Sequence, residues 1–263
     1  MKVLKNIYFE LLIVLYLAVV LSFVETQRLS VPCRGIAVEI DKDPPHDFID
    51  QEEVRKMIAN KGVKTKGVLL ESINILKLEK AINLNPSIER SDVHRELNGS
   101  LCVTVKQRNP ILRVMNQMNI SYYIDEKGAM MPLSDRYAAR VPIANGFILN
   151  PYISKYYRDV TKISPGDTIN KAVLRDLYLL SKYINQNAFL QSLVEQIFVT
   201  EDYDFVLVPK IGPSTIMFGT MDDYEEKCKK LWIMYKEALP LGGWDKYASI
   251  DLQFKNQVVC TKK

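Results

Sequence analysis

Two histidines and four cysteines are the side chains of this 263-residue chain best suited to metal binding or nucleophilic chemistry. His46 lies in a Pro-rich stretch. His94 follows Val93 on the opposite face of a predicted strand. Neither histidine has a partner at the spacing of an H-E-x-x-H zinc site. We therefore expect no metal site and two loop or solvent-facing histidines. No C-x-x-C pair exists, and buried thiols and structural disulfides both remain open for Cys33, Cys102, Cys228 and Cys260.

No pattern in the sequence supplies catalytic machinery. A G-x-S-x-G nucleophile elbow and a G-x-x-x-x-G-K-[ST] phosphate loop are both missing. Paired carboxylates such as Glu52-Glu53 and Asp222-Asp223 fit helix starts and solvated faces. The 35 basic and 31 acidic residues give a net charge of +4, without a basic run that would bind nucleic acid. We expect no enzyme, no cofactor and no nucleic-acid partner.

An apolar run from Ile7 to Val24 predicts a single transmembrane helix. Its 18 residues would extend roughly 27 Å as a helix, close to the thickness of a bilayer core. A cleaved signal peptide is the alternative, but no small-x-small cleavage site follows the run. Lysines before the helix favour a cytoplasmic amino terminus. The prediction is a tail over 1–6, a span over 7–24, a linker over 25–32 and a protein that is mostly periplasmic.

Residues 33–107 are predicted to form a β-α-α-β-β module. Ile36, Val38 and Ile40 alternate with polar or small residues, as in a half-buried strand. One helix is expected from Asp50, where Glu53 completes a capping box, to a stop at Gly62, and a second over 75–83. Asn98-Gly99 predicts a tight hairpin with both turn residues at positive φ, and with Val93 and Leu97 on the buried side. Its sheet edges are expected to be available for a partner strand.

Residues 108–263 are predicted to form a mixed or antiparallel β domain with flanking helices. Strands are expected at 122–124, 130–133, 196–200, 205–209 and 214–219. A long helix is predicted over 170–185, with Val173, Leu177 and Leu180 at helical spacing. A second is predicted over 222–238, closed by Pro240. Two strand-like pieces in 247–260, with Ile250, Leu252 and Phe254 on one face, complete the sheet. The fold class is therefore α+β.

Several segments resemble the FtsQ/DivIB cell-division family. The matching motifs are Asn85-Pro86-x-Ile88, Val105-x-Gln107-Arg108-x-Pro110-Ile111 and Tyr123-Ile124-Asp125-x-x-Gly128. These motifs occur in the family's order, behind an amino-terminal apolar span. The closing tract Tyr247-x-x-Ile250-Asp251-Leu252 also matches. Gln253 stands where an Arg is usual, and Phe254 replaces a Tyr. The first module then resembles a POTRA domain.

The resemblance implies a non-enzymatic scaffold at the division septum of the bacterial inner membrane. Its expected partners are FtsB- and FtsL-like membrane coiled-coil proteins, in complexes that control septal peptidoglycan synthesis. The family's contact is strand addition to the edge of the last strand. By the closing motif, that edge is expected at Phe254, Lys255, Asn256, Gln257, Val258 and Val259. The alternative functions are a POTRA-type chaperone or assembly factor that binds envelope protein strands, and a membrane-anchored envelope enzyme.

Overall fold

The computed structural model describes residues 10–22, 31–60, 67–152, 159–163, 169–213 and 215–263. The chain divides into two compact units, and each is described by itself. The first unit contains residues 1–45 and 49–107, and the second contains residues 46–48 and 108–263.

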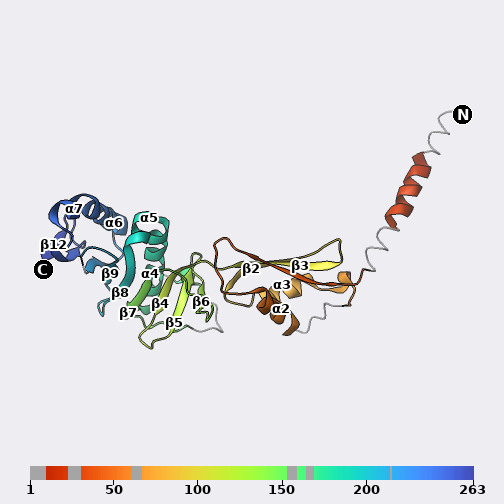
Figure 1. The fold of residues 1–263 in the computed structure, drawn as a ribbon, viewed down its shortest axis with the longest axis horizontal. Coiled ribbons are helices and arrows are strands. Elements are labelled where there is room, and N and C mark those ends of the chain that lie inside the picture. Colours follow the sequence, from red (N-terminus) through yellow and green to blue (C-terminus); the bar gives the residue numbers. More distant parts are fainter. Residues whose placement is uncertain (1–9, 23–30, 61–66, 153–158, 164–168, 214) are drawn as a thin grey trace. The chain divides into compact units, whose positions relative to one another are not determined.

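Residues 10–22 form a helix whose apolar side chains are exposed, among them Leu12, Leu15 and Leu21 (Figure 1). Among the residues that the structure describes, no helix has both the length and the apolar character required to cross a bilayer. The predicted span of Ile7 to Val24 includes residues 7–9 and 23–24, which lie outside the described part of the chain.

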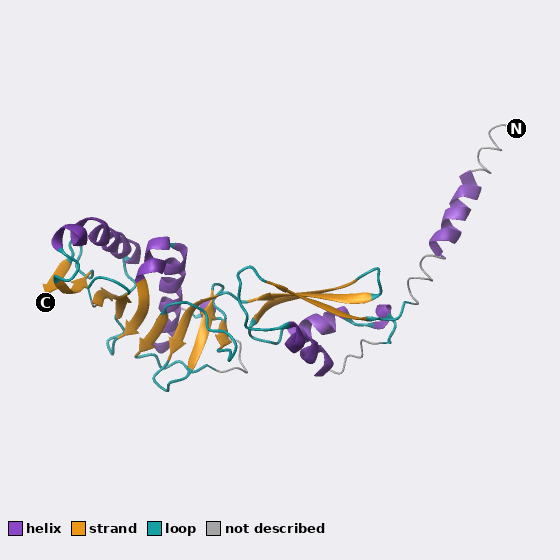
Figure 2. Ribbon diagram, viewed as in Figure 1, coloured by secondary structure: helices purple, strands orange, loops and turns teal. Residues whose placement is uncertain are grey.

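The first unit has the predicted β-α-α-β-β order. Strand β3 is central, pairing in parallel with β1 and antiparallel with β2. The helices lie on one face of this sheet (Figure 2), and Val54, Leu78, Val93 and Val103 belong to the core that they cover. The elements are β1 (Gly35–Asp41), α2 (Gln51–Asn60), a 3₁₀ turn η1 (Leu70–Ser72), α3 (Ile75–Ile82), β2 (Ile88–Arg95) and β3 (Ser100–Gln107).

Local capping explains where α2 begins. The Glu53 amide donates to Asp50 Oδ1 over 2.6 Å, and the Asp50 amide donates to Glu53 Oε2 over 3.1 Å. This reciprocal pair is the predicted capping box, which satisfies two amides near the helix start. The predicted stop at Gly62 lies outside the described residues.

The β2–β3 hairpin forms as predicted, but its turn differs. Gly99 has a φ of +87°, whereas Asn98 is not among the residues with positive φ. The Glu96 amide donates to Ser100 O over 2.9 Å, and the Gly99 amide donates to Glu96 O over 3.1 Å. Three residues therefore form the loop, and only its last position needs a glycine. The extra loop residue moves Leu97 out of the strand, so the prediction that Leu97 is buried is wrong: it is 96% exposed.

The second unit contains one nine-stranded mixed sheet, which fits the predicted α+β class. The strand order is β12-β11-β10-β9-β8-β7-β4-β5-β6. Strand β7 lies parallel to both β4 and β8, and β11 lies parallel to β10, while the other pairs are antiparallel. The strands are β4 (Pro110–Met115), β5 (Ser121–Asp125), β6 (Met130–Pro132), β7 (Ile143–Gly146), β8 (Val194–Val199), β9 (Phe205–Pro209), β10 (Thr215–Gly219), β11 (Tyr247–Asp251) and β12 (Val259–Lys262).

Helices complete the second unit. The predicted long helix is α4 (Ile169–Gln186), whose Leu177 and Leu180 are fully buried in the core. The last predicted helix is α6 (Tyr224–Ile233), which continues through a π-helical turn (Met234–Ala238) into α7 (Leu239–Gly242). The sequence did not indicate β7, α5 (Ala188–Leu193) or the 3₁₀ turn η2 (Val160–Lys162). Helix α4 packs against β4, and α5 packs against α4.

Candidate partner-binding edge

The carboxy-terminal hairpin forms one end of the large sheet. Strand β11 pairs with β10 on one side and with β12 on the other. Strand β12 is the outermost strand, and no further strand among the described residues pairs with its outer side. An outermost strand has backbone N–H and C=O groups that can pair with a strand from another protein.

The six residues predicted as the binding edge lie mostly in the turn before this strand. Only Val259 belongs to β12, while Phe254 to Val258 connect the two strands of the hairpin. The outermost strand is therefore Val259–Lys262, and five of the six predicted residues precede it. Phe254 is 46% exposed, and Lys255, Asn256 and Gln257 are exposed as well.

The strand breaks after Asp251 for local reasons. The Gln253 amide donates to Asp251 Oδ1 over 2.9 Å, which is an Asx turn. Asn256 then takes a left-handed conformation with a φ of +59°, as asparagine tolerates in turns. The alternation of Ile250, Leu252 and Phe254 suggested a longer strand, but side-chain alternation does not detect these backbone turns.

Along β12, the backbone N–H and C=O groups of alternate residues face away from β11. The Lys263 amide donates to Lys246 O over 3.2 Å, so the backbone of Lys263 faces the β11 side. Backbone groups alternate in direction along an antiparallel strand. Thr261 therefore faces β11, and the N–H and C=O groups of Cys260 and Lys262 face outward. These outward groups define the candidate binding edge, named the β12 edge below.

Helix α6 fixes the turn beside the β12 edge. Lys230 Nζ donates to Leu252 O over 3.1 Å and to Phe254 O over 2.8 Å. The Leu252 side chain is fully buried, and its amide donates to Met217 O of β10 over 2.9 Å. The turn is thus tied to a helix and to a central strand, so the β12 edge is supported by the core of the unit.

Gln253, which replaces the usual Arg of the closing motif, lies against Gly219. A Cβ atom at Gly219 would lie only 2.8 Å from Gln253 Cγ. Gln253 is exposed, and its amide side chain is uncharged, unlike an arginine side chain. The family's charge at this position is therefore missing from the surface next to the hairpin.

Burial shifts the pKa of two groups in this part of the second unit, Cys260 and Lys227. Burial raises the pKa of the Cys260 thiol, which keeps it protonated and poorly nucleophilic at neutral pH. Burial also lowers the pKa of Lys227, an effect that the nearby Asp222 carboxylate opposes. Lys227 Nζ donates to Thr220 O over 2.8 Å and lies 5.2 Å from the centroid of the Phe218 ring. These contacts give Lys227 a structural role.

The two histidines lie in different surroundings. His46 lies in a loop, as predicted, and is half-buried: Nε2 lies 2.9 Å from Asn109 Oδ1, and Nδ1 lies 3.2 Å from the Tyr137 hydroxyl. His94 is exposed on β2, as predicted.

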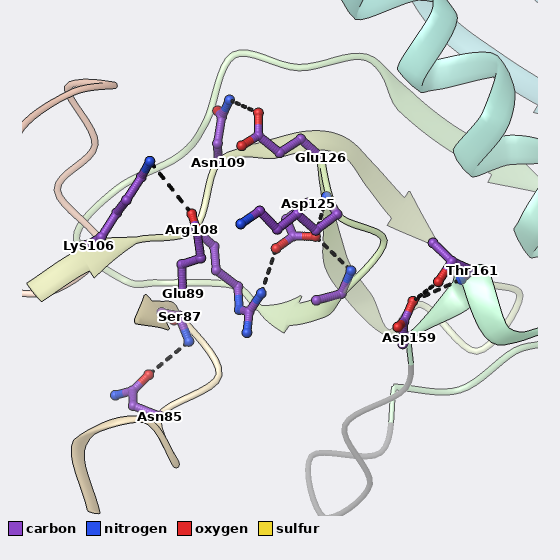
Figure 3. Close-up of polar contacts among 12 residues, drawn as sticks. Asn85, Ser87, Glu89, Lys106, Arg108, Asn109, Asp125, Glu126, Asp159 and Thr161 are labelled. Atoms are coloured by element: carbon purple, nitrogen blue, oxygen red, sulfur yellow. Dashed lines mark hydrogen bonds and ion pairs between the residues drawn. The ribbon is translucent and has the colours of Figure 1, made fainter. Parts of the chain in front are cut away.

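The Asp125 motif that supports the family resemblance has a structural explanation (Figure 3). Asp125 is 1% exposed, and its Oδ2 accepts a 2.7 Å bond from Arg108 Nη1. Its Oδ1 accepts from the amides of Lys127 at 2.9 Å and Ala129 at 2.6 Å. Gly128, between them, has a φ of +83°, which favours glycine. These contacts stabilise the tight β5–β6 turn, which gives the motif a structural role.

One edge of the sheet in the first unit is partly occupied by its own helix. The Val93 amide on β2 donates to Glu79 Oε1 of α3 over 3.1 Å. The Ser91 hydroxyl donates to Asn83 Oδ1 over 2.9 Å. The expectation that the sheet edges are available is therefore too broad for β2. Within the described part of the chain, β1 pairs with one strand, β3.

Together, these features define an α+β protein that combines a small β-α-α-β-β domain with a larger sheet, whose last strand β12 has no strand on its outer side among the described residues. Comparison with known proteins agrees with this class. Residues 109–261 match the family described as FtsQ/DivIB, C-terminal related, and residues 31–106 match the POTRA-like domain. The chain belongs to the FtsQ/DivIB family.

A known cell division protein is also similar to this chain over much of its length. The cell division protein FtsQ of Geotalea daltonii is 24% identical over 192 residues, which cover 72% of this chain. The aligned region covers 64% of that relative's own length.

Proposed function

We propose that this chain is a non-enzymatic cell-division scaffold that binds FtsB- and FtsL-like membrane coiled-coil proteins by strand addition at the β12 edge. One observation carries the proposal: the outer side of β12 is unpaired among the described residues, while its turn is fixed by Lys230. Such an edge binds through main-chain hydrogen bonds and needs no catalytic group. Family membership supplies the cellular context, because its relative is a cell-division protein.

Apolar residues at the amino terminus support the proposed location. The helix over residues 10–22 exposes Leu12, Leu15 and Leu21 at 64% or more. Exposed leucines on several sides of a helix are unfavourable in water and suit a lipid environment. The proposed topology is a single pass through the inner membrane by Ile7 to Val24, with both units in the periplasm at the septum. There the bound complex would help control septal peptidoglycan synthesis.

The proposal can be tested with a proline on the β12 edge. Cys260→Pro removes an outward N–H, and proline is tolerated on edge strands where its missing N–H faces solvent. Loss of one main-chain hydrogen bond together with steric interference from the ring should weaken partner binding about tenfold or more. The assay is affinity purification of the full chain from native membranes after brief cross-linking, with recovered partners quantified by mass spectrometry.

Lys255→Pro is the matched control. Lys255 lies in the turn before β12, so its proline variant leaves the outward groups of Cys260 and Lys262 in place. The wild type and Lys255→Pro should recover similar amounts of small single-pass coiled-coil proteins. Equal recovery by Cys260→Pro, in a variant with wild-type thermal unfolding, would rule out strand addition at β12. Recovery of outer-membrane or secreted proteins instead would favour an assembly factor.

A further inference from the structure

Three potential metal ligands gather on the first unit's sheet at the β2–β3 hairpin. They are His94 on β2, Glu96 next to the turn and Cys102 on β3, and one ligand atom of each lies within 4.8 Å of the others. His94 and Cys102 are directly opposite in the strand register. The hairpin therefore brings together three potential metal ligands that do not form a short motif in the sequence.

The position of these residues follows from strand alternation. Val93 and Val103 are buried in the core of this unit, and the helices lie on one face of its sheet (Figure 2). Adjacent residues on a strand point to opposite faces, so His94 and Cys102 lie on the face that the helices leave uncovered. Glu96 follows His94 by two residues and extends the set toward the turn. The cluster is accessible to solvent through His94, while Cys102 is only 3% exposed.

We propose that His94, Glu96 and Cys102 bind a borderline-soft divalent cation, with Zn²⁺ the best match. Imidazole nitrogen, carboxylate oxygen and thiolate sulfur are the three ligand types of protein zinc sites. Zinc–ligand bonds of about 2.0–2.3 Å in a tetrahedron place ligand atoms roughly 3.3–3.8 Å apart. The ligand atoms now lie within 4.8 Å of one another, so metal binding would require them to move closer by about 1 Å through side-chain rotation. Water would take the fourth position.

Hydrogen bonds already orient Glu96. Its Oε2 accepts from Asn98 Nδ2 over 2.8 Å and from Ser100 Oγ over 2.5 Å. No hydrogen bond within the described residues involves Oε1, which is available to a metal. The ordered turn thus holds the carboxylate while leaving one oxygen for coordination, so less side-chain entropy is lost on binding.

Asp92 supplies an outer carboxylate for His94. Asp92 Oδ2 lies 3.4 Å from His94 Nδ1. Metal-binding histidines commonly use one ring nitrogen for the metal and donate the other N–H to a carboxylate, which fixes the ring. Asp92 is therefore a positioning residue. Glu39, on the neighbouring strand β1, adds negative charge near the Cys102 sulfur and favours a cation there.

Metal binding would replace the thiol proton of Cys102. Burial raises the pKa of that thiol, and the nearby Glu39 carboxylate adds to the effect. The free thiol is therefore protonated at neutral pH. On binding, the S–H proton passes to solvent and the sulfur forms its bond to the cation, with no change in oxidation state.

Cobalt titration of the full chain, purified in detergent without a polyhistidine tag, tests the site. Tetrahedral Co²⁺ with a thiolate ligand gives a sulfur-to-metal charge-transfer band in the near ultraviolet. One Co²⁺ per chain should produce this band, and Zn²⁺ should abolish it by displacement. Cys102→Ser should remove the band, His94→Ala should weaken binding by at least about tenfold, and Asp92→Asn should weaken it about tenfold.

Cys33→Ser is the matched control, because Cys33 is the other cysteine of the first unit and is 2% exposed. This variant should bind Co²⁺ like the wild type. His94 is exposed, so its alanine variant should fold normally, which circular dichroism can confirm. The site is disproved if the wild type gives no thiolate band, if Cys33→Ser removes it, or if His94→Ala binds Co²⁺ with unchanged affinity.

Discussion

Replacing Asp125 by alanine should destabilise the second unit by about 4 kcal/mol. The Asp125 carboxylate is 1% exposed and has three hydrogen-bond partners, including Arg108. Removing one partner of a buried charged pair typically costs about 3–5 kcal/mol. Bonds between a charged group and backbone amides contribute about 1.5–3 kcal/mol each. These terms overlap, so their sum is not the expected loss.

Asp125→Asn should cost less, about 2 kcal/mol. Its amide oxygen can still accept from the amides of Lys127 and Ala129, while the ion pair with Arg108 is lost. Burial raises the pKa of Asp125 in spite of the Ala129 amide and the Arg108 guanidinium. The cost of desolvating the carboxylate therefore outweighs its favourable contacts, and removing the charge recovers part of that cost.

Tryptophan fluorescence during urea unfolding measures this prediction for the correct unit. The chain has two tryptophans, Trp232 and Trp244, and both belong to the second unit. The free energy of unfolding is extrapolated to zero urea for each variant. The signal therefore follows the unit that contains Asp125, even if the first unit unfolds separately.

Asp135→Asn is the control for loss of a carboxylate, since Asp135 is exposed. Its free energy of unfolding should remain within about 0.5 kcal/mol of the wild type. The expected order is wild type, Asp125→Asn, then Asp125→Ala, from most to least stable. An Asp125→Ala variant within 1 kcal/mol of the wild type would refute a structural role for this motif.

Two further predictions concern the second unit. Gly128→Ala should destabilise it by about 1–3 kcal/mol, because the φ of +83° disfavours a side chain and the new Cβ would lie 2.6 Å from Thr161 Cγ2. Gly242→Ala, whose Cβ would meet no atom closer than 3.8 Å, is the control in the same urea assay. Separately, burial raises the pKa of Cys228 to about 12 from 9.0. The unfolded thiol then ionises at lower pH than the native one, so stability should fall by up to about 1.4 kcal/mol per pH unit as pH rises above 9. Urea unfolding at several alkaline pH values should show a steeper fall for the wild type than for Cys228→Ala, and parallel curves would contradict this reasoning.

Local sequence patterns determined most elements of the first unit. Alternation of apolar residues specified β1, and the Asp50–Glu53 pair marked the start of α2. The Asn98-Gly99 pair located the β2–β3 hairpin. These features depend on residues within a few positions of one another, so periodicity and capping chemistry suffice to predict them. The hairpin's loop length was not predictable from the pair alone, which is why Leu97 was misplaced.

The tertiary structure decided which strands pair and where the binding edge lies. Strand β7 has only four residues, yet it lies between β4 and β8 in the sheet. Its pairing depends on segments that are distant in the sequence, and four residues are too few to show the periodicity of a strand. The position of the β12 edge likewise depends on the turn that Asp251 begins and that Lys230, from α6, holds in place.

The cluster of His94, Glu96 and Cys102 illustrates the same division. The sequence determined the residue types and the hairpin. Sequence motifs for metal sites, however, are defined by ligands spaced along one segment. The pairing of β2 with β3 places His94 opposite Cys102, eight positions later in the chain. Strand register brings side chains together across a sheet according to nonlocal hydrogen bonding and core packing, so only the folded structure shows which ones meet.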